Sequence, residues 1–495
     1  MAALLPAGWE QRLVDINVRP LRDKDLDWAD LVLTGGMITQ QLGAVEVIRR
    51  AHARGKPVAV GGPDATSQPQ VYEEADFIVA GEGEASVPLL VHAWESGQRS
   101  GRLRPEGPRP NLRTSPVPRF DLVRLGDYLY PGVQFSRGCC HDCEFCDIAA
   151  RFGRPPRCKS PKQLLRELGV LRKAGHHGHV DIVDDNLIGH RPAAKAMLEA
   201  LAGWLEKEGH PFSFSAQVTL SLAQDEELLA LCRRCGLRYL FIGIETPDPD
   251  LLLGADKPQN ASLDVRACVK RLNESGMMVL GGFILGFDRE KPGAGKAVAA
   301  CVEGARIGTA MAGLLTSLPD TRMDARLIHE KRLLVREKGA AIRPGESDQM
   351  TGGLNFIPLR PRLEILREYR ELLLRLYAPS AFFKRVRGFL AWFRSCGKYR
   401  PRITLLPRLA WMVATTTFSY LLRPGDFPHF ALTVASGLFR GTDAFAMAMM
   451  QSMFYLHLDK QTRHVVEHLD RQIQDVEKLG EEGYNAKRGA FIHRP

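Results

Sequence analysis

The chain contains 495 residues, of which 45% are hydrophobic and 25% are charged. These are the proportions of an ordinary globular protein, and the length predicts two or three domains with a large hydrophobic core. The ten cysteines are mostly scattered singly, and no basic segment followed by an apolar one comes after Met1. Both features argue against a secreted, disulfide-linked protein, so we expect a cytoplasmic one.

The net charge of +10 originates in a single segment. Between Glu371 and Asp426 the sequence contains ten basic residues and no acidic residue. Without those ten, the basic residues of the chain fall from 67 to 57, which equals the number of acidic residues. We therefore expect any partner that binds through charge to bind this segment.

The first hundred residues alternate between short apolar runs and helix-like stretches. This alternation predicts a parallel sheet with crossover helices, so we expect a Rossmann-like (flavodoxin-like) domain over residues 1–100. The helix-like stretches include 42–55 and 85–94, and the apolar runs are 12–18, 29–34, 57–60 and 76–80.

Glycine-rich loops follow the predicted strands of this domain. Ligands of open α/β sheets bind at the carboxyl ends of the strands, and glycine there lets the ligand approach the backbone closely. A nucleotide or a corrin ring would both fit this arrangement. The candidate binding residues are Gly35, Gly61, Gly62, Thr66, Gly81 and Glu82.

Residues 101–130 read as a linker, because prolines at 105, 108, 110, 116 and 118 prevent a continuous helix or central strand. A second alternation of strands and helices follows over residues 131–325. Its six predicted strands are 133–136, 180–183, 212–218, 239–244, 278–285 and 313–316.

A cysteine-rich loop comes directly after the first of these strands. Cys139, Cys143 and Cys146 have a C-x3-C-x2-C spacing. Three thiolates can hold three irons of a [4Fe–4S] cluster, which leaves the fourth iron open to a small molecule. A zinc site with His141 or Cys140 as fourth ligand is the alternative, and Cys140 also offers a C-x2-C-x2-C register.

The Ser136-Arg137-Gly138-Cys139 lead-in and this spacing resemble the cluster loop of radical S-adenosylmethionine (SAM) enzymes. The loops at 61–66 and 81–84 resemble the cobalamin-binding half of the cobalamin-dependent members, in particular the group that contains the hopanoid methylases. The resemblance implies a partial (β/α)6 barrel, a [4Fe–4S] cluster, SAM, cobalamin and an external electron donor. It also implies SAM contacts at Phe145, Asp184, Asp185 and Glu245, with Phe145 beside the adenine.

Two features depart from the family pattern. The sequence has no Asp-x-His-x-x-Gly motif, so no histidine is placed to bind the lower face of the cobalt. The opening residues 1–6 read as the first helix of the cobalamin domain, so we expect its usual first strand to be missing. Because that strand is central in a flavodoxin-like sheet, its loss bears directly on cobalamin binding.

We expect residues 326–495 to be mostly helical, beginning with an amphipathic helix over 361–377. The apolar runs that follow are shorter than the ~18–20 residues that span a bilayer. Together with the basic segment, they predict that residues 372–425 lie on the inner face of the membrane. The alternatives are a helical cap whose basic residues are merely solvated, or nucleic-acid binding, which the clustered aromatics do not favour.

The function implied is C-methylation of an unactivated carbon in an apolar, polycyclic or lipid-like substrate. In such enzymes a 5′-deoxyadenosyl radical abstracts hydrogen and methylcobalamin delivers the methyl group. The alternatives are a radical SAM oxidase, cyclase or isomerase on the same scaffold without methyl transfer, or a cluster- or corrinoid-binding regulator without catalysis.

Overall fold

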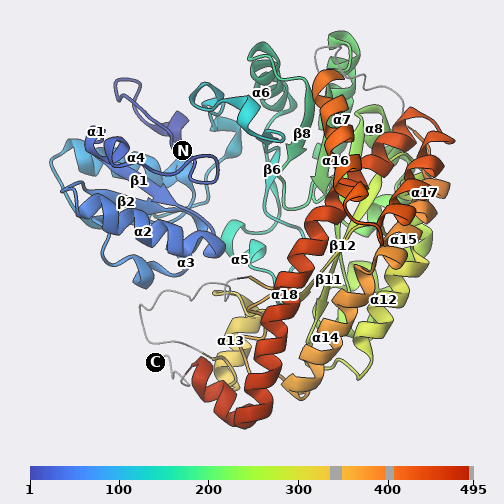
Figure 1. Cartoon of the computed structure of the whole chain (residues 1–495). Helices are drawn as coiled ribbons and strands as arrows, with labels where there is room; N and C mark the ends of the chain where they lie inside the picture. The colour runs from blue at the N-terminus through green and yellow to red at the C-terminus, as the bar shows by residue number, and fades with distance from the viewer. Residues whose placement is uncertain (335–347, 396–405, 490–495) are drawn as a thin grey trace.

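The structure is a computed structural model that describes residues 1–334, 348–395 and 406–489. It contains a small N-terminal parallel sheet, a six-stranded parallel sheet and a C-terminal set of helices. Figure 1 shows the N-terminal domain in blue on one side of the larger sheet and the C-terminal helices in orange and red on the other. The predicted fold class is confirmed.

The N-terminal sheet is covered on both faces. Alternate residues of a strand point to opposite faces, so Val58 and Val60 pack with Ile48 on one face, while Ala59 packs with Leu90 on the other. Four parallel strands pair in chain order, namely β1 (Val32–Gly35), β2 (Val58–Gly61), β3 (Phe77–Val79) and β4 (Gly101–Leu103). The helices are α1 (Asp23–Trp28), α2 (Gln41–His52), α3 (Gly62–Ser67) and α4 (Gly83–Glu95).

Two predictions about this domain were wrong. Residues 12–18 form no strand: the Asn17 backbone N–H donates to the Asp15 carboxylate in a turn, and Ile16 is half exposed. Asx turns of this kind compete with strand pairing. In addition, β4 lies inside the predicted linker, ahead of its first proline, and pairs with β3 at the sheet edge. We propose that the first domain extends to Leu103.

The larger sheet has six parallel strands in the order β12-β11-β10-β9-β8-β5, with β5 and β12 at its edges. All six predicted strands are present, with shifted ends. The strands are β5 (Gly132–Val133), β8 (Gly178–Ile182), β9 (Phe212–Gln217), β10 (Leu237–Glu245), β11 (Met278–Leu285) and β12 (Ala310–Leu314). The helices of this part are α5 (Ile148–Phe152), α6 (Pro161–Lys173), α7 (Arg191–Glu208), α8 (Glu226–Arg234), α9 (Pro249–Gly254), α10 (Pro258–Ala261), α11 (Val265–Glu274), α12 (Ala294–Gly304) and α13 (Arg322–His329).

The C-terminal helices pack on the β12 side of this sheet. The predicted helix over 361–377 is confirmed as α14 (Arg362–Leu376), and its Tyr369 hydroxyl donates to the Ala312 carbonyl at 2.9 Å. The remaining helices are α15 (Pro379–Trp392), α16 (Leu406–Leu421), α17 (Phe427–Leu438) and α18 (Thr442–Arg488), the last crossing the molecule in Figure 1. Among the described residues, none of the helices is both long and apolar enough to cross a membrane.

Candidate cluster and cofactor site

The cysteine loop is held at its base by a two-stranded hairpin. Strand β6 (Ser136–Arg137) pairs antiparallel with β7 (Arg157–Cys158), so both ends of the loop are fixed beside β5. Gly138 has φ +98°, and a Cβ there would lie 2.7 Å from the Gly153 carbonyl oxygen. Only glycine therefore fits the point where the chain turns towards Cys139.

The three cysteines of the motif are free thiols and partly buried. Burial, against an opposing backbone hydrogen bond from Ile148 and together with the nearby charge of Asp147, raises the pKa of Cys146 to about 12. The Cys140 thiol donates a hydrogen bond to Cys139 and lowers its pKa. Within the described residues, no group of three or more His, Cys, Asp or Glu could hold a single metal ion.

Asp184 fixes the start of the cysteine loop. The carboxylate is fully buried and accepts hydrogen bonds from the backbone N–H groups of Phe135 and Ser136, each at 2.7 Å, and from the Ser136 hydroxyl. Its burial raises its pKa to about 7, against the opposing effect of these hydrogen bonds. Both carboxylate oxygens thus already accept hydrogen bonds from the chain itself. Asp184 binds Phe135 and Ser136 here, whereas the resemblance implied a contact with the SAM amine.

Asp185 and Asn186 lie closer to the cysteines themselves. One Asp185 oxygen accepts from the Gly138 N–H at 2.9 Å, and the carboxylate is only partly buried. The Asn186 amide bonds to Cys139 and helps to lower the pKa of that thiol. Its own carbonyl oxygen is buried without a partner among the described residues. Asp185 is therefore the carboxylate of the pair that retains room for a cationic ligand.

Glu245 ends strand β10 and is paired with a buried lysine. Its carboxylate forms an ion pair with Lys257, whose ammonium also donates to the Gly243 carbonyl at 2.9 Å. Glu245 has φ +66°, a conformation that is uncommon outside glycine and typical of functional sites. A Cβ at Gly243 would lie 2.3 Å from the Glu245 carboxylate, so a larger residue there would displace that side chain from its present position beside Lys257.

A hydrogen bond to the cluster loop that sequence reasoning missed comes from Gln259. Its side-chain amide donates to the Cys143 sulfur at 3.8 Å, and Asn260 donates to the Gly243 carbonyl at 2.9 Å. The carbonyl oxygens of both amides are buried and have no partner among the described residues. The only signal in the sequence is the polar run Asp256-Lys257-Pro258-Gln259-Asn260, which no local pattern links to the cysteines.

A cavity of about 330 Å³ opens beside the cysteines. Cys143 and Cys146 line it together with Arg154, Arg322 and Asp320. Asp320 adopts φ +66°, a conformation that glycine accepts freely and that is uncommon for other residues.

The glycine loops of the N-terminal domain contact the cysteine loop directly. Arg137 forms ion pairs with Glu82 and Glu84, and Arg157 forms another with Glu82 at 2.7 Å. From α5, the Arg151 guanidinium donates to the Pro63 carbonyl at 2.5 Å. The carboxyl ends of the two parallel sheets therefore face each other.

The predicted cobalamin contacts lie together at this junction, but two of them have internal partners. The Thr66 hydroxyl donates to the Gly62 carbonyl at 2.8 Å and accepts from the Gly81 N–H at 2.9 Å. The Glu82 carboxylate forms ion pairs with Arg137 and Arg157. A Cβ at Gly35 would lie 2.1 Å from the Gly61 carbonyl oxygen. The backbones of Gly35 and Gly61 therefore pack directly against each other where β1 and β2 end.

Comparison with known proteins agrees with this geometry. Residues 133–296 match the radical SAM superfamily, and residues 321–471 match a domain of unknown function (DUF4070). The chain is 42% identical over 387 residues to the uncharacterized methyltransferase sll1242 of Synechocystis, covering 78% of this chain and 71% of that protein. It is 33% identical over 388 residues to the hopanoid C-2 methylase of Rhodopseudomonas palustris, with the same coverage of 78% and 71%.

The chain belongs to the radical SAM superfamily, in its cobalamin-binding type.

Solved structures show the same fold. The cobalamin-dependent SAM radical enzyme OxsB, with aqua-cobalamin and SAM bound, superposes with a TM-score of 0.57 at 15% identity and covers 95% of this chain and 76% of its own. The methyltransferase TsrM of Kitasatospora setae, with cobalamin and a [4Fe–4S] cluster bound, gives 0.55 at 19% identity, with 71% and 74% covered. A radical SAM enzyme of this type uses a [4Fe–4S] cluster, SAM and cobalamin.

The residues of this radical SAM protein fit these groups. Cys139, Cys143 and Cys146 are three free thiols on one loop, which matches a cluster whose fourth iron stays open. Phe145, which the resemblance places beside the adenine, lies edge-on to Phe287 with ring centroids 6.0 Å apart and so borders the end of β11. The predicted cobalamin residues of the N-terminal domain lie at the junction with the cysteine loop, and no histidine motif accompanies them.

Proposed function

We propose that this radical SAM enzyme is a cobalamin-dependent methyltransferase that methylates an unactivated carbon of an apolar, polycyclic or lipid-like substrate. The observation that carries the proposal is the contact between the two sheet ends through the Glu82–Arg137 and Arg151–Pro63 interactions. This contact brings the glycine loops that we propose to bind cobalamin next to the cysteine loop. Methyl transfer to a carbon radical requires both cofactors beside one substrate.

The relatives support the methyl-transfer part of this proposal. The two relatives described above carry the names uncharacterized methyltransferase and hopanoid C-2 methylase. A hopanoid C-3 methylase from Methylococcus capsulatus is a third, at 27% identity over 194 residues. Each name describes its own protein, and together they favour an apolar polycyclic substrate class here.

The interior of the six-stranded sheet supports an apolar substrate. Register places Phe241 beside Leu280 and Gly282 beside Met311, so their side chains share one face. Met311 is 47% exposed although its neighbours Ala310 and Ala312 are buried, which marks that face as open to a ligand. Alternation along a strand separates this open face from the packed outer one.

A polar layer lies on the same sheet nearer the start of its strands. His179 contacts the hydroxyls of Ser213 at 3.1 Å and Ser215 at 2.9 Å, and Ser215 in turn donates to Asp181. Burial lowers the pKa of His179 to about 3, so this imidazole is neutral at pH 7. We propose that this layer forms the floor below the apolar substrate.

When bound, the cluster with SAM supplies the radical that removes hydrogen, and cobalamin supplies the methyl group. The chain's own residues provide the setting. We propose that Asp185 holds the SAM ammonium as a charge-assisted hydrogen bond, while Asp184 keeps the loop in register. The Glu245–Lys257 pair supplies a buried polar edge, and Phe145 and Phe287 exclude water from the reacting groups.

The test is anaerobic reconstitution with iron, sulfide and cobalamin, followed by incubation with a low-potential chemical reductant and SAM that carries a deuterated methyl group. We expect a corrin spectrum, 5′-deoxyadenosine in the products, and deuterated methylcobalamin on the protein by mass spectrometry. Absence of deuterium from the corrin, with 5′-deoxyadenosine still formed, would reject methyl transfer while preserving radical SAM chemistry. Absence of both products would reject the enzyme itself in favour of a cofactor-binding regulator.

A second candidate is a cyclase or related radical enzyme without methyl transfer. One relative supports it, an anaerobic magnesium-protoporphyrin IX monomethyl ester cyclase from Synechocystis, which is 26% identical over 242 residues. The match covers 45% of this chain, less than the 78% covered by the match to the hopanoid C-2 methylase. The labelled-methyl experiment separates the two candidates.

A further inference from the structure

Helices α16 and α17 expose large apolar side chains that nothing in the described structure covers. On α16, Trp411 and Leu422, which directly follows the helix, are 70% and 69% exposed, and Phe418 lies between them. Positions 411, 418 and 422 differ by seven and four residues, so they share one helical face. On α17 and its end, Leu432 and Phe439 repeat the spacing of seven, with Phe439 91% exposed. Contiguous exposed apolar surface of this kind marks an interaction site.

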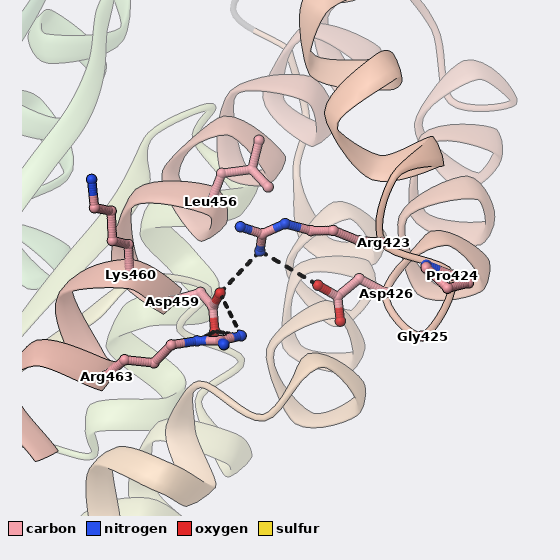
Figure 2. A pocket seen from close by; sticks show the side chains of 8 residues that line it. All are labelled: Arg423, Pro424, Gly425, Asp426, Leu456, Asp459, Lys460 and Arg463. Atoms are coloured by element: carbon pink, nitrogen blue, oxygen red, sulfur yellow. Dashed lines mark hydrogen bonds and ion pairs between the residues drawn. The ribbon is translucent and has the colours of Figure 1, made fainter. Parts of the chain in front are cut away.

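A charged cavity lies where the two helices join. Its volume is about 530 Å³, and Figure 2 shows it between the 423–426 turn and α18. Arg423 pairs with Asp459 at 2.9 Å and with Asp426 at 3.6 Å, while Arg463 shares the same Asp459 at 3.1 Å. Lys460 lines the cavity as well and forms no ion pair within the described part of the chain. Three cations therefore share two carboxylates, which leaves the cavity positive.

The apolar face and the positive cavity are adjacent, because exposed Leu422 directly precedes Arg423. We propose that α16, α17 and this cavity form a docking surface for an anionic lipid membrane. The apolar side chains would enter the interface, and a lipid phosphate would occupy the cavity beside Lys460. Such a helix lies in the plane of the membrane without crossing it.

The charge of the cavity favours a lipid surface over a second copy of the chain. Two copies joined through this face would bring two positive cavities together, and like charges repel. An anionic leaflet carries the complementary charge and attracts each nearby Lys or Arg. Trp411, 70% exposed on this face, is a side chain that prefers the membrane interface.

The structure also narrows the surface expected from sequence. Several cations of the 372–425 segment are not available, because Arg385 is buried and Arg375 pairs with Glu303 at 2.8 Å. Lys384 and Arg394 are exposed. Lys398, Arg400 and Arg402 lie outside the described residues. The described docking surface therefore rests on α16, α17 and the cavity rather than on the whole basic segment.

The experiment is vesicle co-sedimentation of the full chain without SAM or substrate, so its result is independent of the proposed function. Phosphatidylcholine vesicles are compared with vesicles that also contain phosphatidylglycerol, at low and high salt. We expect binding to the anionic vesicles only, and we expect salt to weaken it. Binding to neither vesicle type would overturn the proposal.

Variants locate the binding surface. Phe418→Ser combined with Leu422→Ser should weaken vesicle partitioning by about tenfold or more, since it removes two apolar anchors. Lys460→Glu should weaken binding to anionic vesicles selectively. The matched controls are Leu129→Ser, which changes an equally exposed leucine (70%) far from this face, and Lys24→Glu, an exposed lysine of α1. Both controls should bind like the wild type.

Two results would overturn the assignment. Equal loss in the control variants would show a general effect of surface polarity or charge. A concentration-dependent dimer by analytical ultracentrifugation that Phe418→Ser with Leu422→Ser abolishes, without vesicle binding by the wild type, would assign the face to a second copy. Far-UV circular dichroism checks that each variant remains folded.

Discussion

At the scale of single residues, the candidate site is distinguished by polar groups that serve the cysteine loop. Gln259 and Asn186 direct amides at Cys143 and Cys139, and Asp184 accepts three hydrogen bonds from the residues just before the loop. Hydrogen bonds to cluster sulfurs are one of the means by which a protein sets the reduction potential. The residues next to the ligands therefore bear on how easily the cluster is reduced.

Gln259→Leu should lower the reduction potential of the reconstituted cluster, on the order of tens of millivolts, because it removes a hydrogen bond that stabilises the added electron. The measurement is a redox titration followed by electron paramagnetic resonance. Gln474→Leu, on the exposed face of α18, is the control and should leave the potential unchanged. An unchanged potential in Gln259→Leu would show that the 3.8 Å contact has no electronic effect.

Asp184→Ala should destabilise the protein by about 2–5 kcal/mol, because two buried backbone N–H groups lose their acceptor. Asp184→Asn should destabilise the protein less than Asp184→Ala does. Comparison of Asp184→Asn with the wild type isolates the effect of the carboxylate charge on stability. The raised pKa of about 7 means that the folded state holds a proton more tightly than the unfolded state. The contribution of Asp184 to the free energy of unfolding is therefore largest below about pH 4 and declines as the pH rises to 7. Thermal unfolding of both proteins between pH 4 and 8 tests this expectation. As the pH rises, the wild type should lose stability relative to Asp184→Asn.

At the scale of elements, the hairpin β6–β7 and the turns after the strands set the position of the site. Positive φ angles occur at Gly138, Glu245 and Asp320, which all lie at the carboxyl-end edge of the sheet. Only the first of these is glycine. In parallel β/α folds the functional residues commonly lie on loops that a rigid sheet positions. In this protein the strained backbone conformations occur at the same edge of the sheet as those loops.

Gly138→Ala should reduce iron incorporation, because its Cβ would lie 2.7 Å from the Gly153 carbonyl in a backbone conformation that alanine disfavours. We expect a loss of about 1–3 kcal/mol in local stability. The measurement is iron and sulfide content per chain after reconstitution. Gly169→Ala, in α6 with open space around it, is the matched control and should be neutral or slightly stabilising. Full iron content in Gly138→Ala would contradict the steric argument.

At the scale of the whole molecule, a cluster of ion pairs joins the N-terminal domain to the cysteine loop. Glu82, Glu84, Arg137 and Arg157 are largely buried between the two sheets. Burial opposes ionisation of Glu84, but the hydrogen bonds and charge of Arg137 outweigh it and lower the pKa to about 2. The ion pairs therefore persist at neutral pH and fix one domain against the other.

Arg137→Ala should loosen this junction, because it leaves Glu82 and Glu84 with fewer cationic partners. We expect faster proteolysis in the proline-rich segment after Leu103 and a larger radius of gyration by small-angle X-ray scattering. In the wild type the Glu84 contribution is present above about pH 4.5 and is lost as the pH falls towards 2, since the folded pKa is depressed. Exposed Arg102→Ala, on the edge strand β4, is the control. Unchanged scattering and proteolysis in Arg137→Ala would show that other contacts hold the domains.

The sequence by itself determined the local and periodic features. The cysteine spacing, the alternation that yields six parallel strands, and the helix at 361–377 all depend on short-range order, which periodicity and turn residues report. It also predicted which glycine loops lie at strand ends. It misassigned residues 12–18, because an apolar run cannot show that Asp15 and Asn17 close a turn.

Only the tertiary structure decided how the polar groups are shared. Sequence treated Asp184 and Asp185 alike, but burial gives Asp184 to the loop backbone and leaves Asp185 beside Gly138. The sequence likewise predicted that Glu82 contacts a bound cofactor. In the structure, Glu82 forms ion pairs with Arg137 and Arg157, which follow the linker in the chain. Hydrogen bonds and ion pairs between residues distant along the chain depend on three-dimensional proximity, and no local pattern records that proximity.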